Sequence, residues 1–293
     1  MLDSTPVRRY VRFPLRRLRY RARRLAYRLR HGRTNTPIFF VNSFPKSGTH
    51  LLLQAVRGFS QLGPVMYSGL PATTMFDAFS GERLSEEAVA AQLSRLSDGD
   101  IGYGHVFAEP RLVDSLCRPG MISYFIYRDP RDVVVSHVHY VTEIWTSHVH
   151  HDYYANKLQN FDERLRASIL GRPELTEIDF PGIRERFEPY LRWLDRSEVL
   201  ALRFEDFVRY KEETLEKILA HAASRGFNPR IDHERALEIM AQAIDPEQSP
   251  TFRSGKVGGW REHFTDEHTA LFKKVTGDLL VRLGYEKNVD WQP

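Results

Sequence analysis

Three short apolar runs in this chain each pass directly into a segment with the pattern of a helix. The runs cover residues 38–42 (IFFVN), 121–127 (MISYFIY) and 198–203 (EVLALR). Strands buried on both faces read as continuous apolar runs, and strands that alternate with helices are typical of a parallel sheet with crossover helices. The sequence therefore predicts an α/β fold, a central parallel sheet flanked by helices. The helices are expected at residues 48–62, from about 130, at 183–194, after 203, and from near 265 to 284.

The N-terminus is an arginine-rich arm. Residues 1–33 carry twelve Arg and one Asp, a net charge of +11, whereas the whole chain of 293 residues carries +4, which leaves −7 for the remainder. Because the basic character lies in the arm, a nucleic-acid-binding body is not indicated, and we expect no nucleic-acid partner. We divide the chain into the arm, residues 1–35, and a single domain, residues 36–293.

The arm has the apolar spacing of an amphipathic helix, with arginines over much of its remaining surface. Three alternatives follow for residues 8–30: a helix on an anionic membrane surface, a helix packed on the body, or a solvated basic tail. The chain has one cysteine, Cys117, no apolar run long enough to span a bilayer and no apolar core of a secretory signal, so we expect a cytoplasmic protein, with membrane association through the arm left open. The apolar positions are Val11, Leu15, Leu18, Ala22, Leu25 and Leu29.

The first chemical signal is the segment 43–50 (SFPKSGTH), which joins the first strand to its helix. Free backbone N–H groups and the positive end of the helix dipole converge at such a turn and favour a phosphate group. The segment is not the nucleotide-kinase loop, because there the Lys follows the second Gly, whereas here Lys46 precedes Gly48. Because it joins a strand to a helix N-terminus through a turn of small residues, the segment is nevertheless P-loop-like. The alternative is an ordinary strand-to-helix turn.

Two further segments carry basic and small residues. Arg128 ends the second strand, and Ser136 follows it on the next helix; the ends of neighbouring parallel strands face one crevice, so both are expected near a second anion. The alternative is that Arg128 and Asp132 form only a surface ion pair. A Gly-rich basic loop at 252–261 (FRSGKVGGWR) precedes the last helix, and taken alone it is equally consistent with a solvated turn.

Together, these three segments resemble the nucleotide-dependent sulfotransferase family, which uses 3′-phosphoadenosine 5′-phosphosulfate (PAPS). Residues 45–49 match the family's phosphosulfate loop, Arg128 and Ser136 stand eight residues apart as in its 3′-phosphate motif, and residues 253–261 match its late glycine-rich segment, with Ser254 in place of Lys. The resemblance covers roughly residues 37–285. It implies a P-loop-like sulfotransferase fold and PAPS as the sulfuryl donor.

The resemblance also assigns roles to residues. Lys46 would stabilise the leaving phosphate, and the residues around it would hold the phosphosulfate, while Arg128, Ser136 and the late loop would hold the 3′-phosphate. Adenine contacts are less well matched, because Leu51 replaces the family's Trp and Phe204 stands where a Tyr is usual. The donor-binding residues expected are Lys46, Ser47, Gly48, Thr49, His50, Arg128, Ser136, Phe204, Arg253, Ser254 and Gly255.

A general base is expected at His105. Residues 100–106 (DIGYGHV) read as a short strand between the first and second strands in chain order, and a parallel sheet would bring its end to the same crevice. The family places its catalytic His at this point in the order, with an assisting Lys where this chain has Tyr103. A His with a pKa near neutrality is suited to take the proton of an acceptor hydroxyl. The alternative is a His that only hydrogen-bonds the sheet end.

The reaction expected is in-line sulfuryl transfer to an acceptor hydroxyl on a glycan, a lipid headgroup, or a small alcohol or phenol. Phosphoryl transfer would call for Mg²⁺ and its carboxylates, and no acidic residue directly ends the 121–127 strand, so a nucleotide-dependent small-molecule kinase is kept only as the enzyme alternative. The other alternative is a non-catalytic membrane-docked module of the same fold. We expect no metal, and interpret the histidines between residues 137 and 151 as solvent-facing or acceptor-pocket residues.

Overall fold

The structure, a computed structural model, describes residues 13–77, 81–172, 180–249 and 255–293. The chain divides into two compact units. The first, which we call the sheet unit, comprises residues 1–127 and 190–250, and the second, the helical unit, comprises residues 128–189 and 251–293.

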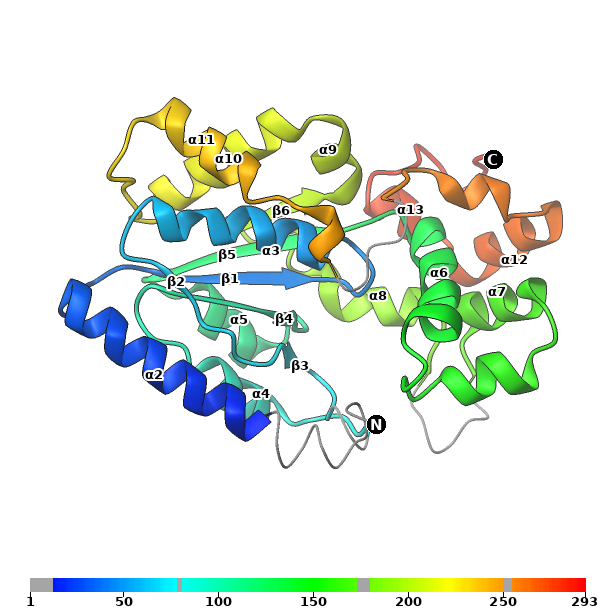
Figure 1. Cartoon of the computed structure of the whole chain (residues 1–293). Coiled ribbons are helices and arrows are strands. Elements are labelled where there is room, and N and C mark those ends of the chain that lie inside the picture. The colour runs from blue at the N-terminus through cyan, green and yellow to red at the C-terminus, as the bar shows by residue number, and fades with distance from the viewer. Residues whose placement is uncertain (1–12, 78–80, 173–179, 250–254) are drawn as a thin grey trace. The chain divides into compact units, whose positions relative to one another are not determined.

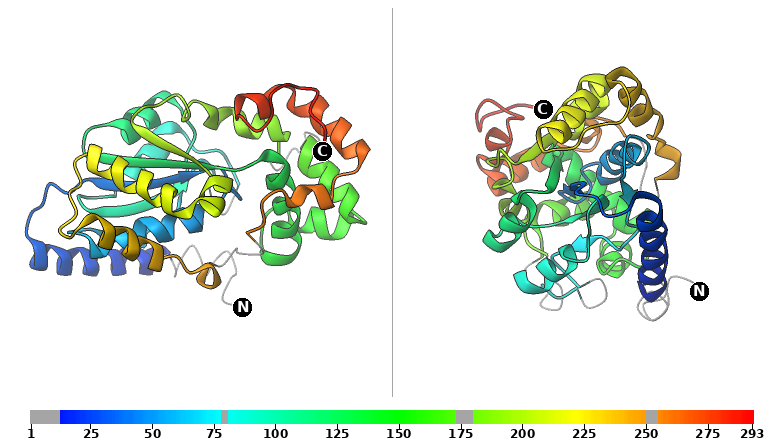
Figure 2. Two further views of the ribbon diagram at one scale, coloured as in Figure 1. Left: turned by 90° about the horizontal axis from the view of Figure 1, so that it is seen from above. Right: turned by 90° about the vertical axis from the view of Figure 1, so that its left-hand side faces the viewer.

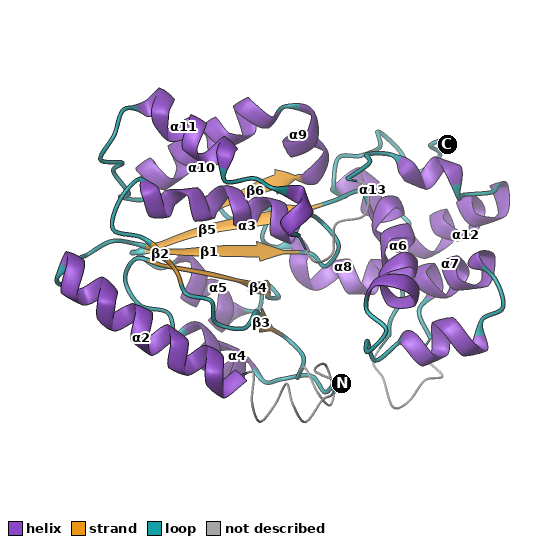
Figure 3. Ribbon diagram, in the orientation of Figure 1, coloured by secondary structure: helices purple, strands orange, loops and turns teal. Residues whose placement is uncertain are grey.

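The sheet unit is built on a parallel sheet with strand order β2-β4-β1-β5-β6, in which the short β3 also pairs with β4 (Figure 3). Strands β1 and β5 are buried along their whole length, because helices cover both faces of the sheet. The predicted parallel α/β architecture is therefore correct. The strands are β1 (Ile38–Ser43), β2 (Met66–Tyr67), β3 (Thr73–Thr74), β4 (Asp100–His105), β5 (Met121–Tyr127) and β6 (Val199–Arg203).

Helices α3, α10 and α11 lie over one face of this sheet, and α4 and α5 lie over the other (Figure 1). The expected helix at 48–62 is present as α3 followed by one 3-10 turn, η2. The helices are α3 (Thr49–Arg57), η2 (Gly58–Gln61), α4 (Glu86–Leu93), α5 (Pro110–Cys117), α9 (Phe204–Arg209), α10 (Lys211–Ser224), α11 (His233–Gln242) and the short η5 (Pro246–Gln248).

The arm forms helix α2 (Phe13–His31), which lies beside the β2–β4 side of the sheet unit (Figure 2). Its residues contact the turn before β4 and the segment around β2. Among the described residues, no helix is long and apolar enough to cross a bilayer.

The helical unit contains α6, which follows β5 in the chain, and the last helices of the protein. Its buried cluster is formed by Val138, Val141, Tyr154, Ala167 and Phe180. The elements are α6 (Pro130–His139), the π-helical turns η3 (Tyr140–Ile144) and η4 (Tyr153–Lys157), α7 (Phe161–Leu170), α8 (Ile183–Leu191, whose last two residues belong to the sheet unit), η6 (Gly259–Glu262), α12 (Asp266–Thr276) and α13 (Leu279–Arg282).

One expectation fails in the helical unit, and of the two alternatives for the histidines between residues 137 and 151, the solvent-facing one is excluded for His137 and His150. The single last helix is broken into α12 and α13, since Gly277 adopts a φ of 54° and ends the first of them. Neither His137 nor His150 faces solvent: both are buried, and both rings pack on Phe180, at centroid distances of 5.3 and 4.3 Å. These two histidines are part of a packed interior.

Candidate active site

The loop between β1 and α3 contains two residues in the left-handed backbone conformation, Lys46 and Gly48. Gly48 has a φ of 91°, and a Cβ atom built there would lie 2.6 Å from Cδ2 of Phe204, so only glycine fits. Lys46 has a φ of 67°, the one non-glycine residue at positive φ in the described part of the chain. A left-handed conformation is costly for a residue with a Cβ, and such strain clusters at functional sites.

The same loop combines a helix N-terminus that has no side-chain cap with a buried hydroxyl that has no partner among the described residues. Gly48 is the N-cap of α3 and supplies no side-chain cap, so the first-turn N–H groups of this helix are not capped by a side chain. The hydroxyl of Ser47 is fully buried, and the described residues offer it no hydrogen-bond partner. A buried polar group without a partner is costly, and an anionic group seated on the loop would satisfy it. The loop therefore fits a phosphate or sulfate group.

His105 is brought to this loop by the order of the strands. Strand β4 pairs with β1 in parallel, and its last residue, His105, lies beside Ser43, the last residue of β1. Nδ1 of His105 is 3.0 Å from the carbonyl oxygen of Ser43 and 3.1 Å from its Oγ. A carbonyl oxygen only accepts, so Nδ1 carries the proton and Nε2 keeps its lone pair in the neutral ring.

The electrostatics of the site keep this ring neutral, and they place its pKa well below the near-neutral value expected from the sequence, which makes the ring a weaker base than expected. Burial lowers the pKa of His105 to about 4, the hydrogen bond to Ser43 opposes that shift, and the charges of His50 and Lys46 add to it. Burial and the Lys46 charge lower the pKa of His50 as well. The sheet unit therefore brings together Lys46, His50 and His105, three of the expected site residues.

The end of β4 is fixed by two residues that the sequence analysis missed. The side chain of Asn42 makes two hydrogen bonds to the backbone of Val106, of 2.9 Å from Nδ2 to the carbonyl and 2.8 Å from the amide to Oδ1. The indole nitrogen of Trp193 donates to the same carbonyl at 2.8 Å. A polar residue within the apolar run IFFVN was the available signal for Asn42.

The remaining expected residues of the sheet unit are Ser47, Thr49 and Phe204. The Thr49 hydroxyl bonds that of Ser43 at 2.7 Å, which ties α3 to the end of β1. Phe204 begins α9 and its buried ring lies against Gly48, so it supports the loop from behind.

In the helical unit, the second and third sequence motifs meet. Arg128 donates from Nη2 to the carbonyl of Lys256 at 2.7 Å, and lies 3.4 Å from Oδ2 of Asp132. Asp132 accepts from the amides of Gly258 (2.8 Å) and Trp260 (2.9 Å). The Gly-rich loop is thus anchored to the start of α6.

The sequence analysis considered Asp132 only as a partner of Arg128 in a surface ion pair, and so missed its role as an anchor of the late loop. The side chain of Asp132 is 2% exposed and that of Arg128 is 13% exposed, so the pair is not the surface ion pair of the alternative. Ser136 lies on α6, one turn beyond Asp132, and Gly255, at a φ of 62°, begins the described part of the late loop. Arg253 and Ser254 lie outside the described residues.

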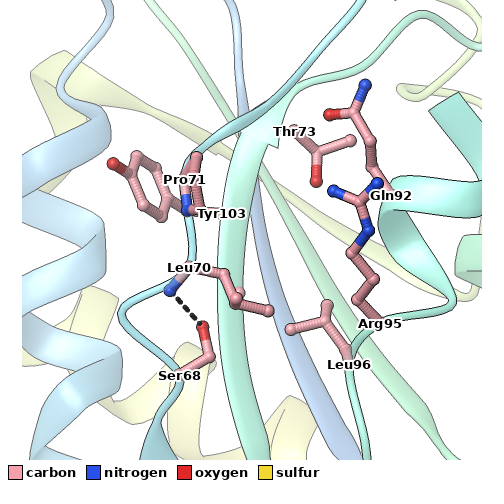
Figure 4. A pocket seen from close by; sticks show the side chains of 9 residues that line it. Ser68, Leu70, Pro71, Thr73, Gln92, Arg95, Leu96 and Tyr103 are labelled. Carbon is pink, nitrogen blue, oxygen red and sulfur yellow. Dashed lines mark hydrogen bonds between the residues drawn. The ribbon is translucent and has the colours of Figure 1, made fainter. Parts of the chain in front are cut away.

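A small pocket in the sheet unit is lined in part by Tyr103 (Figure 4). The ring of Tyr103 is 6.4 Å from that of His50, and burial raises the pKa of Tyr103 to about 12, so its hydroxyl stays protonated at neutral pH. Tyr103 therefore both contacts His50 and lines this pocket. The pocket is lined by Ser68, Leu70, Pro71, Thr73, Gln92, Arg95, Leu96, Gly102 and Tyr103.

A loop that fits an anion between a parallel strand and a helix, with a neutral histidine at the end of the neighbouring strand, is the arrangement expected of a P-loop-like α/β transferase. The family is identified by comparison: the model of the sulfotransferase domain matches residues 36–284, and the chain belongs to that family. This confirms the family and the enzyme class expected from the sequence, and it sets aside the kinase alternative.

Solved structures agree in fold. A mouse sulfotransferase, SULT7A1, complexed with PAP, aligns with a TM-score of 0.57 and 16% identity over 87% of this chain and 86% of its own. Retinol dehydratase in complex with androsterone and inactive cofactor PAP aligns with a TM-score of 0.57 and 17% identity, over 87% and 82%. Its complex with retinol and PAP gives 0.57 and 18%, over 88% and 84%. A comparison with curated protein sequences gives no match.

Within the residues described, no group of three or more His, Cys, Asp or Glu side chains is arranged to hold a metal ion. The cluster of His137, His148 and His150 is accordingly treated as packing, with ring centroids 4.9–6.3 Å apart.

Proposed function

We propose that this protein transfers the sulfuryl group of PAPS to an acceptor hydroxyl, with His105 as general base and Lys46 on the leaving group. The observation that carries the proposal is the Nδ1 contact of His105 with the Ser43 carbonyl, which leaves Nε2 as an acceptor of protons beside the Lys46 loop.

Donor binding divides between the two sets of residues described above. The 5′-phosphosulfate is assigned to Ser47, Gly48, Thr49 and His50. The helix at this loop has no side-chain cap on its N–H groups, and the buried Ser47 hydroxyl has no hydrogen-bond partner among the described residues. Arg128, Ser136 and the loop of Gly255, together with Arg253 and Ser254, are proposed for the 3′-phosphate. Support for the donor comes from the relatives of this fold that were crystallised with PAP.

When bound, the donor supplies an SO₃ group that passes in line between two oxygens. The bond from sulfur to the acceptor oxygen forms as the bond from sulfur to the phosphate oxygen breaks, and the products are a sulfate ester and adenosine 3′,5′-bisphosphate (PAP). Nε2 of His105 takes the hydroxyl proton during this step. The ammonium group of Lys46 stabilises the charge that develops on the phosphate oxygen.

For the acceptor, we propose a hydroxyl compound, with glycan, lipid headgroup and small alcohol or phenol as the classes to compare. Retinol dehydratase binds androsterone and retinol, which are apolar molecules with a hydroxyl group. Tyr103, whose ring is 6.4 Å from that of His50, also lines a pocket of mixed apolar and polar residues. We further propose a cytoplasmic enzyme that meets membranes through helix α2.

The test is a donor assay against a panel of these acceptors, with release of PAP as the readout. Release of PAP that depends on both PAPS and an acceptor, without added metal, supports the proposal. Activity that requires ATP and Mg²⁺ would return the kinase alternative. Tight binding of PAP without turnover on any acceptor class would indicate the non-catalytic module.

A further inference from the structure

Helix α2 has two faces of different character, and the polar one contacts the body. The Tyr20 hydroxyl donates to Oδ2 of Asp100 at 2.6 Å, and that of Tyr27 to the Pro64 carbonyl at 2.5 Å. Arg23 and Arg24 donate to the carbonyls of Ser68 (2.7 Å) and Asp98 (2.6 Å).

This docking is built into the body as well as into the helix. Asp100 has a fully buried side chain that also accepts from the Ser97 amide at 2.8 Å, and Tyr27 is 6% exposed. Gly99 has a φ of 76°, and a Cβ atom there would lie 2.4 Å from the Tyr27 hydroxyl. A side chain at this position would therefore displace the helix. Helix α2 is therefore a fixed element of the sheet unit.

The apolar face of the same helix points away from the body. Leu18, Leu25 and Leu29 are 62, 61 and 81% exposed, and Leu15 is 40% exposed. At about 100° per residue the four leucines lie within an arc of about 80°, which is centred roughly opposite Tyr20 and Tyr27. We call this face the leucine stripe: Leu15, Leu18, Ala22, Leu25 and Leu29.

Exposed arginines flank the leucine stripe on both sides. Arg21 and Arg28 follow it on one side, and Arg19 and Arg30 on the other. An apolar strip between two cationic rows is the surface that binds at the interface of an anionic bilayer, where leucines enter the acyl boundary and arginines meet the headgroups.

We propose that α2 binds an anionic lipid surface through the leucine stripe while it stays docked on the sheet unit through Tyr20, Arg23, Arg24 and Tyr27. Membrane binding and packing on the body are then simultaneous properties of opposite faces. Charge favours lipid over a second copy of the chain, because a dimer through the leucine stripe would place the arginine rows of the two copies against each other. The remainder of the chain carries a net charge of −7, so the attraction to an anionic bilayer must come from the arginines of the arm.

The test uses the full chain with vesicles of phosphatidylglycerol and phosphatidylcholine, and with vesicles of phosphatidylcholine alone, without donor or acceptor. We expect co-sedimentation with the anionic vesicles that weakens as salt is raised. Leu18→Ser with Leu25→Ser should lower the partition coefficient roughly 100-fold, since each inserted leucine contributes about tenfold. Arg21→Gln with Arg28→Gln should lower it roughly 25-fold. Leu170→Ser, at a leucine 48% exposed in the helical unit, is the matched control and should change nothing.

Three outcomes would overturn the proposal. Equal binding by the double-leucine variant would show that the arginines alone attract the vesicles. A concentration-dependent dimer in sedimentation velocity, abolished by the same variant, would assign the leucine stripe to a second copy. Faster hydrogen exchange at residues 66–70 and 99–102 on vesicle binding would show that α2 leaves the body. Because no outcome depends on turnover, failure here is distinguishable from failure of the proposed activity.

Discussion

His105 and Ser43 end neighbouring strands, and the ring nitrogen Nδ1 of the first lies 3.0 Å from the carbonyl oxygen of the second. This contact selects the tautomer in which Nε2 is unprotonated, so the geometry fixes which nitrogen can act as a base. His105→Ala should lower kcat about 10²–10⁴-fold, the range for loss of a general base. The PAP-induced rise in melting temperature should stay within error of the wild-type value.

Near-normal turnover of His105→Ala with intact PAP binding would place the base elsewhere. His50→Ala is then the next variant, because its ring is also held neutral beside Lys46.

The pH dependence of kcat/KM follows from the lowered pKa of His105. The base is active when unprotonated, and a pKa of about 4 means that it loses activity only as the pH falls through about 4. An exposed histidine would lose it near 6.5. We expect kcat/KM, which reports the free enzyme, to be flat from pH 7 down to about 5; an acidic limb centred at 6.5 would contradict the burial of the ring.

Gly48→Ala should lower the free energy of unfolding by more than the cost of placing an alanine in a left-handed backbone conformation. A methyl group there meets Phe204 at 2.6 Å, so we expect a loss of about 1–3 kcal/mol of unfolding free energy beyond the left-handed strain, and loss of the PAP-induced stabilisation. Gly32→Ala is the control, since Gly32 also has a positive φ, of 71°, but has nothing within 4 Å. Equal effects of the two substitutions on PAP binding would refute the steric argument.

Asp132 should matter for donor binding although it is not expected to touch the donor. It anchors the amides of Gly258 and Trp260, so Asp132→Ala should release the late loop and reduce the PAP-induced rise in melting temperature toward that given by AMP. Asp114→Ala, at an exposed aspartate of α5, is the control. An unchanged difference between PAP and AMP in Asp132→Ala would separate this loop from 3′-phosphate recognition.

His150 makes the protein less stable in acid. Burial, with the charges of His148 and Arg186, lowers the pKa of His150 to about 3, below that of the unfolded chain. The unfolded state therefore binds the extra proton, and stability present above about pH 6.5 is lost as the pH falls toward 3. The slope of unfolding free energy against pH between 4 and 6 should be shallower in His150→Phe than in the wild type, as measured by urea titration; parallel slopes would contradict it.

The sequence predicted the parts of the fold whose local pattern and tertiary environment agree. Strands β1 and β5 are buried on both faces, and their residues are apolar throughout, so both were recognised within one residue of their bounds. Strands β2 and β3 have two residues each, too few to show a period. The end of the first predicted helix at residue 62 differs only by the tightening of its last turn into η2.

The residues of the candidate site also divide into those that the sequence predicted and those that it did not. Lys46, Gly48 and Arg128 belong to contiguous motifs, whereas Asn42 and Asp132 act on backbone groups 64 and more than 120 residues away, which no local pattern reveals. Packing of α2 on the body was one of the three alternatives drawn from the sequence, but the face that packs was not predicted, for a related reason. Apolar periodicity predicts that the leucines pack, but the hydroxyls of Tyr20 and Tyr27 and the guanidinium groups find carbonyl and carboxylate partners on the body instead.

The bond between Tyr20 and Asp100 has a practical meaning for work on this protein. Asp100 begins the strand that His105 ends, so a single strand of six residues joins the docked helix to the proposed base. A chain that starts at residue 34 lacks Tyr20 and Arg24, and therefore leaves the buried carboxylate of Asp100, at the start of β4, without these two partners. Truncation for crystallisation or expression should stop short of residue 13, and solubility is better sought by changing the exposed leucines than by removing the helix that bears them.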